Sequence, residues 1–220
     1  MAKKSKIPKI IRILKKHYKE FEIPIVTKIS FENNPFRVLI SCLLSLRTKD
    51  EMTARAFNNL FKIAGTPEKI SRLNAKRIEK AIKSVNYYKT KAKRIKDISR
   101  VLVKKYNSKV PESFEKLLKL KGVGRKTANI VMGYGFNHPE ALAVDVHVHV
   151  ISNRLGIVKT KTADETEKEL RKVLPKRYWP DYNDLMVGYG QNICRTAYPR
   201  CGACHIVKYC IYPYKNLNRK

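Results

Sequence analysis

Acidic residues are scarce in this sequence of 220 residues. Asp and Glu number 18 against 48 Lys and Arg, so the formal net charge is +30 at pH 7. A lysine-rich surface adapted to heat would carry abundant acidic partners as well, so heat adaptation alone does not explain the imbalance. A chain this cationic repels itself unless a polyanion neutralises it. Nucleic acid is therefore the leading partner.

Long apolar runs are also missing. No stretch approaches the ~20 residues of a membrane-spanning helix, and the first segment, MAKKSKIPKIIRIL, lacks the apolar core of a signal peptide. An anionic membrane surface could still attract the charge, but we expect a cytoplasmic, DNA-associated protein that does not bind membranes. Internal repeats and low-complexity segments are absent too. The length then suits one large globular domain or two small ones.

Cysteines are few, and their distribution does not fit a disulfide framework. Without a secretion signal a reducing compartment is expected, where clustered cysteines hold metal more often than disulfides. Four thiolates suit a [4Fe-4S] cluster or a zinc ion. Iron–sulfur is favoured because zinc more often uses paired C-x2-C knuckles, and the spacing C-x6-C-x2-C-x5-C contains only one. The candidate ligands are Cys194, Cys201, Cys204 and Cys210.

Apolar residues recur at helical spacing along most of the chain, which predicts an all-α fold of many short helices. Cys42 lies on the apolar side of one such segment and is expected in the core. Plausible N-caps are Asp50, Thr66 and Ser113. One segment differs. The run AVDVHVHVI alternates and is β-branched, so its periodicity alone predicts a strand over 144–151.

The stretch KLKGVGRKTAN places two glycines one residue apart between apolar segments. We expect a helix over 113–120, a connection over 121–124 and a second helix over 125–136, together a helix-hairpin-helix. Gly122 and Gly124 permit positive φ and expose backbone N–H groups to a phosphate. Such a contact holds DNA without reading its sequence. A plain glycine turn between packed helices is the alternative. The expected DNA-binding residues here are Lys121, Gly122, Val123, Gly124 and Arg125.

Lys126 lies in the first turn of the second predicted helix. The positive helix end and the neighbouring cations Lys121 and Arg125 disfavour an ammonium ion at this position. A partly deprotonated lysine is a nucleophile that can form a Schiff base with an electrophilic carbon. Lys126 is therefore a candidate catalytic residue, with phosphate binding as the alternative.

Asp145 is the second catalytic candidate, because a lone carboxylate among apolar residues is unusual in this chain. Two other roles compete: N-cap of a helix that begins at Val146, or partner of one of the many cations. His147 and His149 are two residues apart, which is not the i, i+4 spacing of paired helical metal ligands. We interpret both histidines as structural.

The motifs LKGVGRKTANIVMGYGF, ALAVDVHV and the cysteine spacing occur in this order, and with them the sequence resembles the endonuclease III family of DNA glycosylases from LLSLRTKDE onward. The resemblance implies an all-α fold with two lobes and DNA bound in the cleft between them. A six-helix barrel over 29–139 would contain the hairpin (113–136), and a second lobe formed by 1–28 and 140–220 would hold the [4Fe-4S] cluster. It also implies a helix after Asp145.

The same resemblance implies the chemistry. The lysine matching Lys126 attacks C1′ of a flipped-out damaged nucleoside, and the aspartate matching Asp145 assists base loss and proton transfer. The resulting imine permits β-elimination, which cuts the strand 3′ to the abasic site. Damaged, mainly oxidised, pyrimidines in duplex DNA are the expected substrates. The protein is expected to act as a monomer, with a cluster that shapes a DNA-contacting loop.

Two positions depart from the family pattern. The residue that fills the gap left by the flipped base is often Gln, in LLSAQATD, and here it is Arg47. The leucine wedge of GLY is here Tyr87. Arg can pair with the orphaned base and Tyr can stack into the duplex. An ordinary surface Arg and a packing Tyr are the alternatives. The substitutions leave the lesion spectrum and the opposite-base preference open.

Two other functions compete with a bifunctional enzyme. One is a monofunctional glycosylase that acts on thymine or uracil opposite guanine, or on adenine. Such relatives tend to lack the hairpin lysine, and the adenine-specific ones carry an extra C-terminal domain, whereas this sequence has Lys126 and stops soon after Cys210. The other is a non-enzymatic module, in which the hairpin binds DNA and the cluster is a scaffold or a redox sensor.

Overall fold

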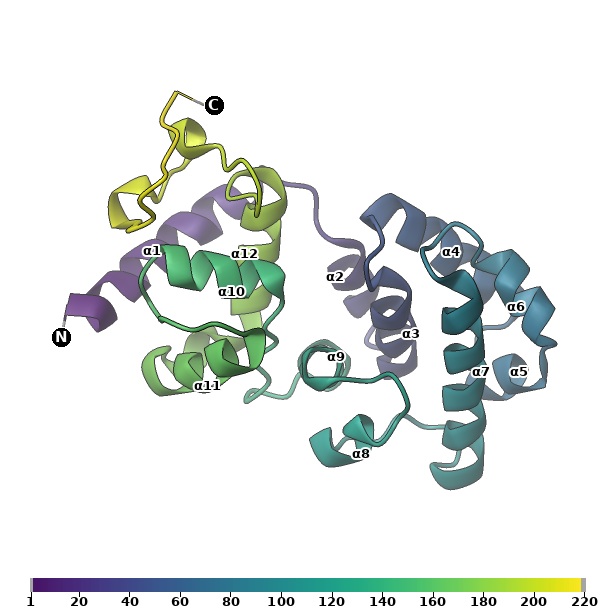
Figure 1. Ribbon diagram of the computed structural model, residues 1–220. Helices are drawn as coiled ribbons and strands as arrows, with labels where there is room; N and C mark the ends of the chain where they lie inside the picture. The colour runs from purple at the N-terminus through teal and green to yellow at the C-terminus, as the bar shows by residue number, and fades with distance from the viewer. Residues whose placement is uncertain (1, 219–220) are drawn as a thin grey trace. The chain divides into compact units, whose positions relative to one another are not determined.

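The computed structural model describes residues 2–218, and side chains from Lys6 onward. Within this range the protein consists of helices and loops, without a strand (Figure 1). The all-α prediction is confirmed. The chain divides into two compact units, which we name for their place in the sequence. The central unit runs from Ile25 to His138. The terminal unit combines the residues up to Pro24 with those from Pro139 onward.

The central unit is built around α3, whose run of apolar residues is buried on almost every side. This helix contacts α2, α4, α7, α9 and η1, so it forms the middle of the core. The elements are α2 (Ile25–Ser30), α3 (Pro35–Ser45), α4 (Asp50–Ile63), α5 (Pro67–Arg72), α6 (Ala75–Ala81), α7 (Tyr88–Lys105), α8 (Phe114–Leu118), α9 (Arg125–Ile130) and the π-helical η1 (Val131–Gly135).

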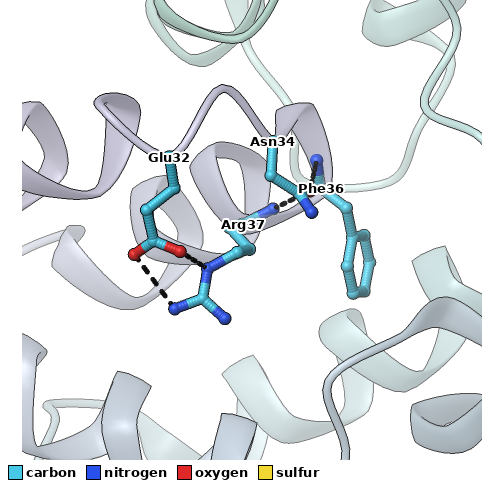
Figure 2. Close-up of polar contacts among 4 residues, drawn as sticks. All are labelled: Glu32, Asn34, Phe36 and Arg37. Carbon is cyan, nitrogen blue, oxygen red and sulfur yellow. Dashed lines mark hydrogen bonds and ion pairs between the residues drawn. The ribbon is translucent and has the colours of Figure 1, made fainter.

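Polar side chains fix the entry to α3, as Figure 2 shows. The Asn34 carboxamide oxygen accepts hydrogen bonds from the backbone N–H groups of Phe36 and Arg37, at 3.0 and 3.1 Å. The Arg37 guanidinium pairs with the Glu32 carboxylate, with Nη2 and Oε1 3.1 Å apart. The same guanidinium lies over the ring of Phe61, 4.5 Å from its centroid. The first turn of α3 is thereby held by a cap, an ion pair and a cation–π contact.

Two of the three expected N-caps are confirmed. The hydroxyls of Thr66 and Ser113 accept hydrogen bonds from the first turns of α5 and α8. The prediction for Asp50 is wrong, because Lys49 occupies the N-cap position of α4 and Asp50 is the first helical residue. The Asp50 carboxylate instead accepts a hydrogen bond from the backbone N–H of Ile25, at 3.0 Å. It therefore connects the starts of α2 and α4.

The terminal unit has one apolar core, to which α1 and the helices after Pro139 both contribute. Helix α12 contacts α1 and α10, and α10 also contacts α11. The elements are α1 (Ala2–Tyr18), α10 (Val146–Arg154), α11 (Ala163–Val173), α12 (Trp179–Asn192) and three 3-10 turns, η2 (Lys176–Tyr178), η3 (Cys201–Ala203) and η4 (Val207–Tyr209). Among the described residues, no helix combines the length and apolar composition needed to cross a membrane.

Helix α10 follows Asp145 directly, so the helix expected there from the resemblance is confirmed and the strand expected from periodicity is wrong. The buried side chains of this helix, Val148, Ile151 and Ser152, lie at helical spacing, whereas Val146 is 53% exposed. The alternating pattern of apolar residues in the sequence therefore does not match the pattern of buried side chains in the helix. Packing of one helical face against α12 decides the structure, and the modest strand preference of valine does not.

Close packing of α10 on α12 depends on Gly190. A Cβ at this position would lie within 3 Å of Nδ1, Cγ and Cβ of His147. We expect Gly190→Ala to destabilise the terminal unit by about 2 kcal/mol, in the range that overpacking usually costs. Urea denaturation followed by circular dichroism measures the effect. Gly124→Ala is the matched control, because no atom lies within 4 Å of the added Cβ and its φ of −97° suits alanine. Equal stability of the two variants would contradict the prediction.

Candidate DNA-binding and catalytic site

The predicted helix-hairpin-helix forms, with α8 and α9 joined by residues 119–124, so the first helix ends two residues earlier than expected. Gly122 has a φ of +90°, which L side chains rarely adopt, and a Cβ there would come within 2.9 Å of Cδ of Arg94. Gly124 is different, because its φ of −97° is open to other residues. The turn does not require glycine at this position, but the absence of a side chain leaves the backbone exposed. The second helix spans the predicted range, but its last part is the wider π-helical η1.

The hairpin residues divide into exposed and buried ones. Lys121, Gly122 and Gly124 are exposed and Arg125 is half-buried, with its guanidinium 5.1 Å from the ring centroid of Phe114. Val123 is only 5% exposed, and its backbone N–H donates to Leu120 O. Its side chain belongs to the core. Because its N–H is already engaged with Leu120 O, Val123 presents no donor to a phosphate in this structure.

Lys126 is half-buried in the first turn of α9. Helix α9 packs against α3, which carries Cys42. Burial raises the pKa of the Cys42 thiol to about 12, and the nearby Lys126 ammonium opposes this rise. Cys42 is 3% exposed, as the core assignment predicted. This proximity of the thiol to the candidate nucleophile could not be predicted from local sequence patterns, because α3 and α9 are far apart along the chain.

Arg47 and Tyr87 lie on two neighbouring loops of the central unit. The Asn86 side-chain amide donates to Arg47 O at 2.5 Å, which joins the loops directly. Both residues have left-handed backbone conformations, with φ of 53° and 56°. Tyr87 is 63% exposed, so it is not a packing residue, and Arg47 is exposed as well. The structure thus brings the two residues together on one surface.

One buried residue near these loops was missed by the sequence analysis. Lys91 of α7 is 4% exposed, and its Nζ donates to Leu44 O, Leu46 O and Thr48 Oγ1 at 2.6, 2.7 and 3.0 Å. A signal was present in the sequence. Lys91 precedes Ile95, Ile98 and Leu102 at helical spacing, so it continues the apolar face of its helix.

Asp145 is the N-cap of α10 and belongs to the terminal unit. Its Oδ1 accepts a hydrogen bond from the backbone N–H of Val148 at 2.9 Å, and the residue is 9% exposed. The capping role considered above is therefore confirmed. It does not exclude a chemical role, because a carboxylate has two oxygens and the cap bond uses one of them. The cap also holds the carboxylate in one orientation at the helix N-terminus, where a negative charge is favoured.

The two histidines of α10 make contacts within the terminal unit. His149 Nδ1 lies 2.7 Å from Thr166 Oγ1, and the His147 ring packs against Gly190. These contacts join α10 to α11 and α12, in keeping with the structural interpretation.

The four clustered cysteines line one hollow of about 290 Å³ in the terminal unit, part of it open to solvent. All four are free thiols. Three N–H or O–H groups reach their sulfurs: Arg154 Nη1 at 3.3 Å from Cys194, Tyr189 OH at 3.4 Å from Cys204, and the Tyr212 N–H at 3.4 Å from Cys210. Burial raises the pKa of Cys194 and Cys204, and the bonds from Arg154 and Tyr189 oppose this. Donors aimed at sulfur suit metal-bound thiolates.

A second group of possible ligands, His17, Glu20 and His205, lies at the end of α1 and beside Cys204. The two imidazole rings are stacked, with centroids 3.5 Å apart and planes 12° from parallel. The nitrogen lone pairs of stacked rings run side by side and do not converge on one ion. We assign no metal to this group.

The chain belongs to the HhH-GPD superfamily of base excision DNA repair proteins, whose family model matches residues 40–176. Within it, the chain is 51% identical to Endonuclease III of Thermotoga maritima over 179 residues, 81% of this chain and 84% of that protein. It is 37% identical to Endonuclease III of Rickettsia prowazekii over 186 residues, 84% of this chain and 87% of that protein. The resemblance inferred from the motifs is confirmed.

Solved structures agree with this assignment. A non-covalent complex of endonuclease III with DNA has a TM-score of 0.84 at 32% identity, covering 94% of this chain and 95% of that one. A trapped covalent intermediate of endonuclease III with DNA has a TM-score of 0.76 at 35% identity, covering 81% and 84%. A thermostable thymine-DNA glycosylase has a TM-score of 0.73 over 92% of this chain, but at 22% identity this likeness concerns the fold alone.

Proposed function

We propose that this protein is a bifunctional DNA glycosylase and abasic-site lyase of base excision repair. It removes damaged pyrimidines, mainly oxidised ones, from duplex DNA and then cuts the strand 3′ to the abasic site. The match to endonuclease III proteins over most of the chain carries this conclusion. A trapped covalent endonuclease III–DNA intermediate is among the matched structures. Formation of such an intermediate requires a nucleophile, and Lys126 in the hairpin supplies an amine.

In the proposed mechanism the Lys126 amine attacks C1′ of the damaged nucleoside. A bond forms between Nζ and C1′ while the bond from C1′ to the base breaks, and the base leaves with the bonding electron pair and a proton. Ring opening gives an imine between Nζ and C1′. The imine acidifies the C2′ hydrogen, and its removal expels the 3′ phosphate by β-elimination. Hydrolysis of the imine then frees the lysine.

The proposed role of Asp145 is electrostatic and acid–base. Positive charge develops on the sugar as the base leaves, and a fixed carboxylate in a poorly solvated position stabilises it. The same carboxylate can hold and return protons during base loss and elimination. The cap bond from Val148 supports this assignment, because a carboxylate already oriented before DNA binds loses little freedom in the reaction.

The target nucleotide must leave the base stack before an amine can reach its sugar, which costs a few kcal/mol and favours damaged bases. We propose that Arg47 occupies the gap beside the orphaned base and that Tyr87 stacks into the duplex. The exposure of both residues on joined loops supports this. The hairpin, with Lys121 and Arg125, is proposed to hold the phosphate backbone through exposed N–H groups and positive charge.

The four clustered cysteines are proposed to hold a [4Fe-4S] cluster. Their number, their convergence on one hollow and the N–H and O–H groups aimed at sulfur fit a thiolate-bound group. When bound, such a group would fix the loop over 194–210, where the exposed Arg195 would be a cation for phosphate. Free thiols also suit the reducing interior of a cell, where we place the protein as a monomer on DNA.

The cluster proposal is tested by elemental analysis of the purified protein. We expect about four iron atoms per chain and little zinc. Cys201→Ser removes one ligand, so iron content and visible absorbance should fall together. Cys42→Ala is the matched control and should keep both, because Cys42 lies in the other unit. One zinc atom per chain in place of iron would overturn the cluster type.

Borohydride trapping tests the proposed function as a whole. The wild-type protein is incubated with duplex DNA that contains one abasic site, and borohydride reduces any imine to a stable bond. A covalent protein–DNA product is expected. A monofunctional glycosylase would excise bases without becoming attached, and a passive DNA-binding module would do neither. Excision rates on oxidised pyrimidines, uracil and mismatched thymine then define the substrate range.

A further inference from the structure

We propose that Lys91 is a positioning residue that holds the Arg47 and Tyr87 loops in the arrangement needed to extrude the target base. This inference rests on the proposed function, because the proposed function is what assigns DNA contacts to the two loops. Lys91 itself is not proposed to contact DNA. It acts through the backbone at the end of α3 and through Thr48.

The first observation is the burial of a charged group on an apolar helix face. Lys91 is 4% exposed, and it occupies the position on α7 that precedes Ile95 by one helical turn. Burial lowers the pKa of Lys91 to about 8. An apolar side chain would fill this position without that cost. The groups that the Lys91 amine binds therefore have to account for its burial.

The second observation is the set of acceptors. Helix α3 ends at Ser45 without a glycine C-cap, and its last carbonyl groups need donors from elsewhere. The Lys91 amine donates to two carbonyl oxygens there, those of Leu44 and Leu46, at 2.6 and 2.7 Å. The chain turns sharply at this point, and Arg47 follows with its left-handed backbone. Lys91 thus fixes the path of the chain into the Arg47 loop.

The third observation is the connection to the second loop. Thr48 Oγ1 accepts from Lys91 Nζ at 3.0 Å and from the backbone N–H of Asn86 at 3.2 Å. The Asn86 side-chain amide in turn donates a hydrogen bond to Arg47 O. The Lys91 backbone N–H also donates to Tyr87 O at 3.0 Å. One amine and one hydroxyl therefore link the end of α3 to the start of α7.

Backbone strain explains why this network matters. Arg47 and Tyr87 are both non-glycine residues with positive φ, a conformation that is strained for L side chains and persists only where the surroundings enforce it. Without the Lys91 amine, Leu44 O loses this donor, Leu46 O is left with the longer hydrogen bond from Thr48 Oγ1 at 3.3 Å, and the Arg47 loop can relax. The wedge and the gap-filling residue would then no longer be held together before DNA binds.

We expect loss of the Lys91 amine to slow base excision much more than attack on a preformed abasic site. Excision of a damaged base requires extrusion of that base, whereas attack on a preformed abasic site does not require removal of a base from the stack. Lys91→Met keeps the volume and the helix but removes the donors. We expect single-turnover base excision to fall between about 10- and 100-fold, the scale of effects from small misplacements. Borohydride trapping on abasic duplex should fall less than about threefold.

The matched control is Lys93→Met, which removes a charge from an exposed position on the same helix. It should leave both rates close to wild type. A 2-aminopurine placed beside the target base reports unstacking by its fluorescence, and the rise seen with wild type and Lys93→Met should be lost with Lys91→Met. Thermal unfolding shows whether each variant is folded at the assay temperature.

Thr48→Val covers the case in which Lys91→Met fails to fold. Valine removes the shared hydroxyl but leaves the two carbonyl bonds of Lys91 in place, and it should produce the same selective loss in a milder form. Equal falls in excision and trapping for either folded variant, or excision by Lys91→Met equal to that of Lys93→Met, would overturn the inference. Failure of the wild-type protein to be trapped would instead overturn the proposed function, so the two failures are distinguishable.

Discussion

Lys126→Gln is expected to abolish the borohydride-trapped complex with abasic DNA and to lower lyase activity by at least about 10³-fold, the scale on which loss of a covalent nucleophile acts. The glutamine amide nitrogen shares its lone pair with the carbonyl group, so it cannot add to C1′. The side chain is of similar length and still polar, and Lys126 lies in the first turn of α9 without a capping role. Folding and DNA binding should therefore survive.

The measurement is the fraction of protein linked to DNA on a denaturing gel after reduction, with circular dichroism and DNA affinity recorded for each variant. Lys119→Gln is the matched control, because Lys119 is an exposed lysine of the same hairpin at the end of α8. It should be trapped as efficiently as the wild type. Trapping of Lys126→Gln at the control level would assign the nucleophile to another amine, and the mechanism proposed for Lys126 would have to be abandoned.

The hairpin and two of the three expected caps could be predicted from the sequence because the interactions that form them are local. Gly122 takes a positive φ within a few residues of the helices that it joins, and Ser113 and Thr66 bond to N–H groups three residues ahead. The clustered cysteines are also local, since all four fall within 194–210. Such features need only spacing and residue type to be found.

Interactions between distant segments could not be predicted in the same way. The carboxylate of Asp50 has the character of an N-cap, but its partner is the Ile25 N–H of another helix. The helical face of α7 indicates that Lys91 is buried, yet its acceptors belong to residues 44–48. The strand pattern after Asp145 was misleading for the same reason, because burial of Val148 and Ile151 depends on packing across the terminal unit.

Asp145→Asn is expected to slow base excision by about 10²- to 10⁴-fold, the range for removal of a general acid–base or charge-stabilising group. The structure makes asparagine a clean probe. Asn caps helices about as well as Asp does, so the bond from the Val148 N–H to the side chain can remain. What disappears is the negative charge that would stabilise a cationic sugar and the ability to exchange protons.

Single-turnover excision of an oxidised pyrimidine measures the chemical step, and fluorescence anisotropy with the same duplex measures affinity. The dissociation constant should change less than about threefold, because the proposed contacts with the DNA backbone are made by other residues. Asp145→Ala separates the two roles, since alanine removes the cap as well and should cost about 1 kcal/mol of stability that asparagine retains. Should Asp145→Asn excise at the wild-type rate while Asp145→Ala only loses stability, Asp145 would be a helix cap and nothing more. Another group would then have to stabilise the sugar.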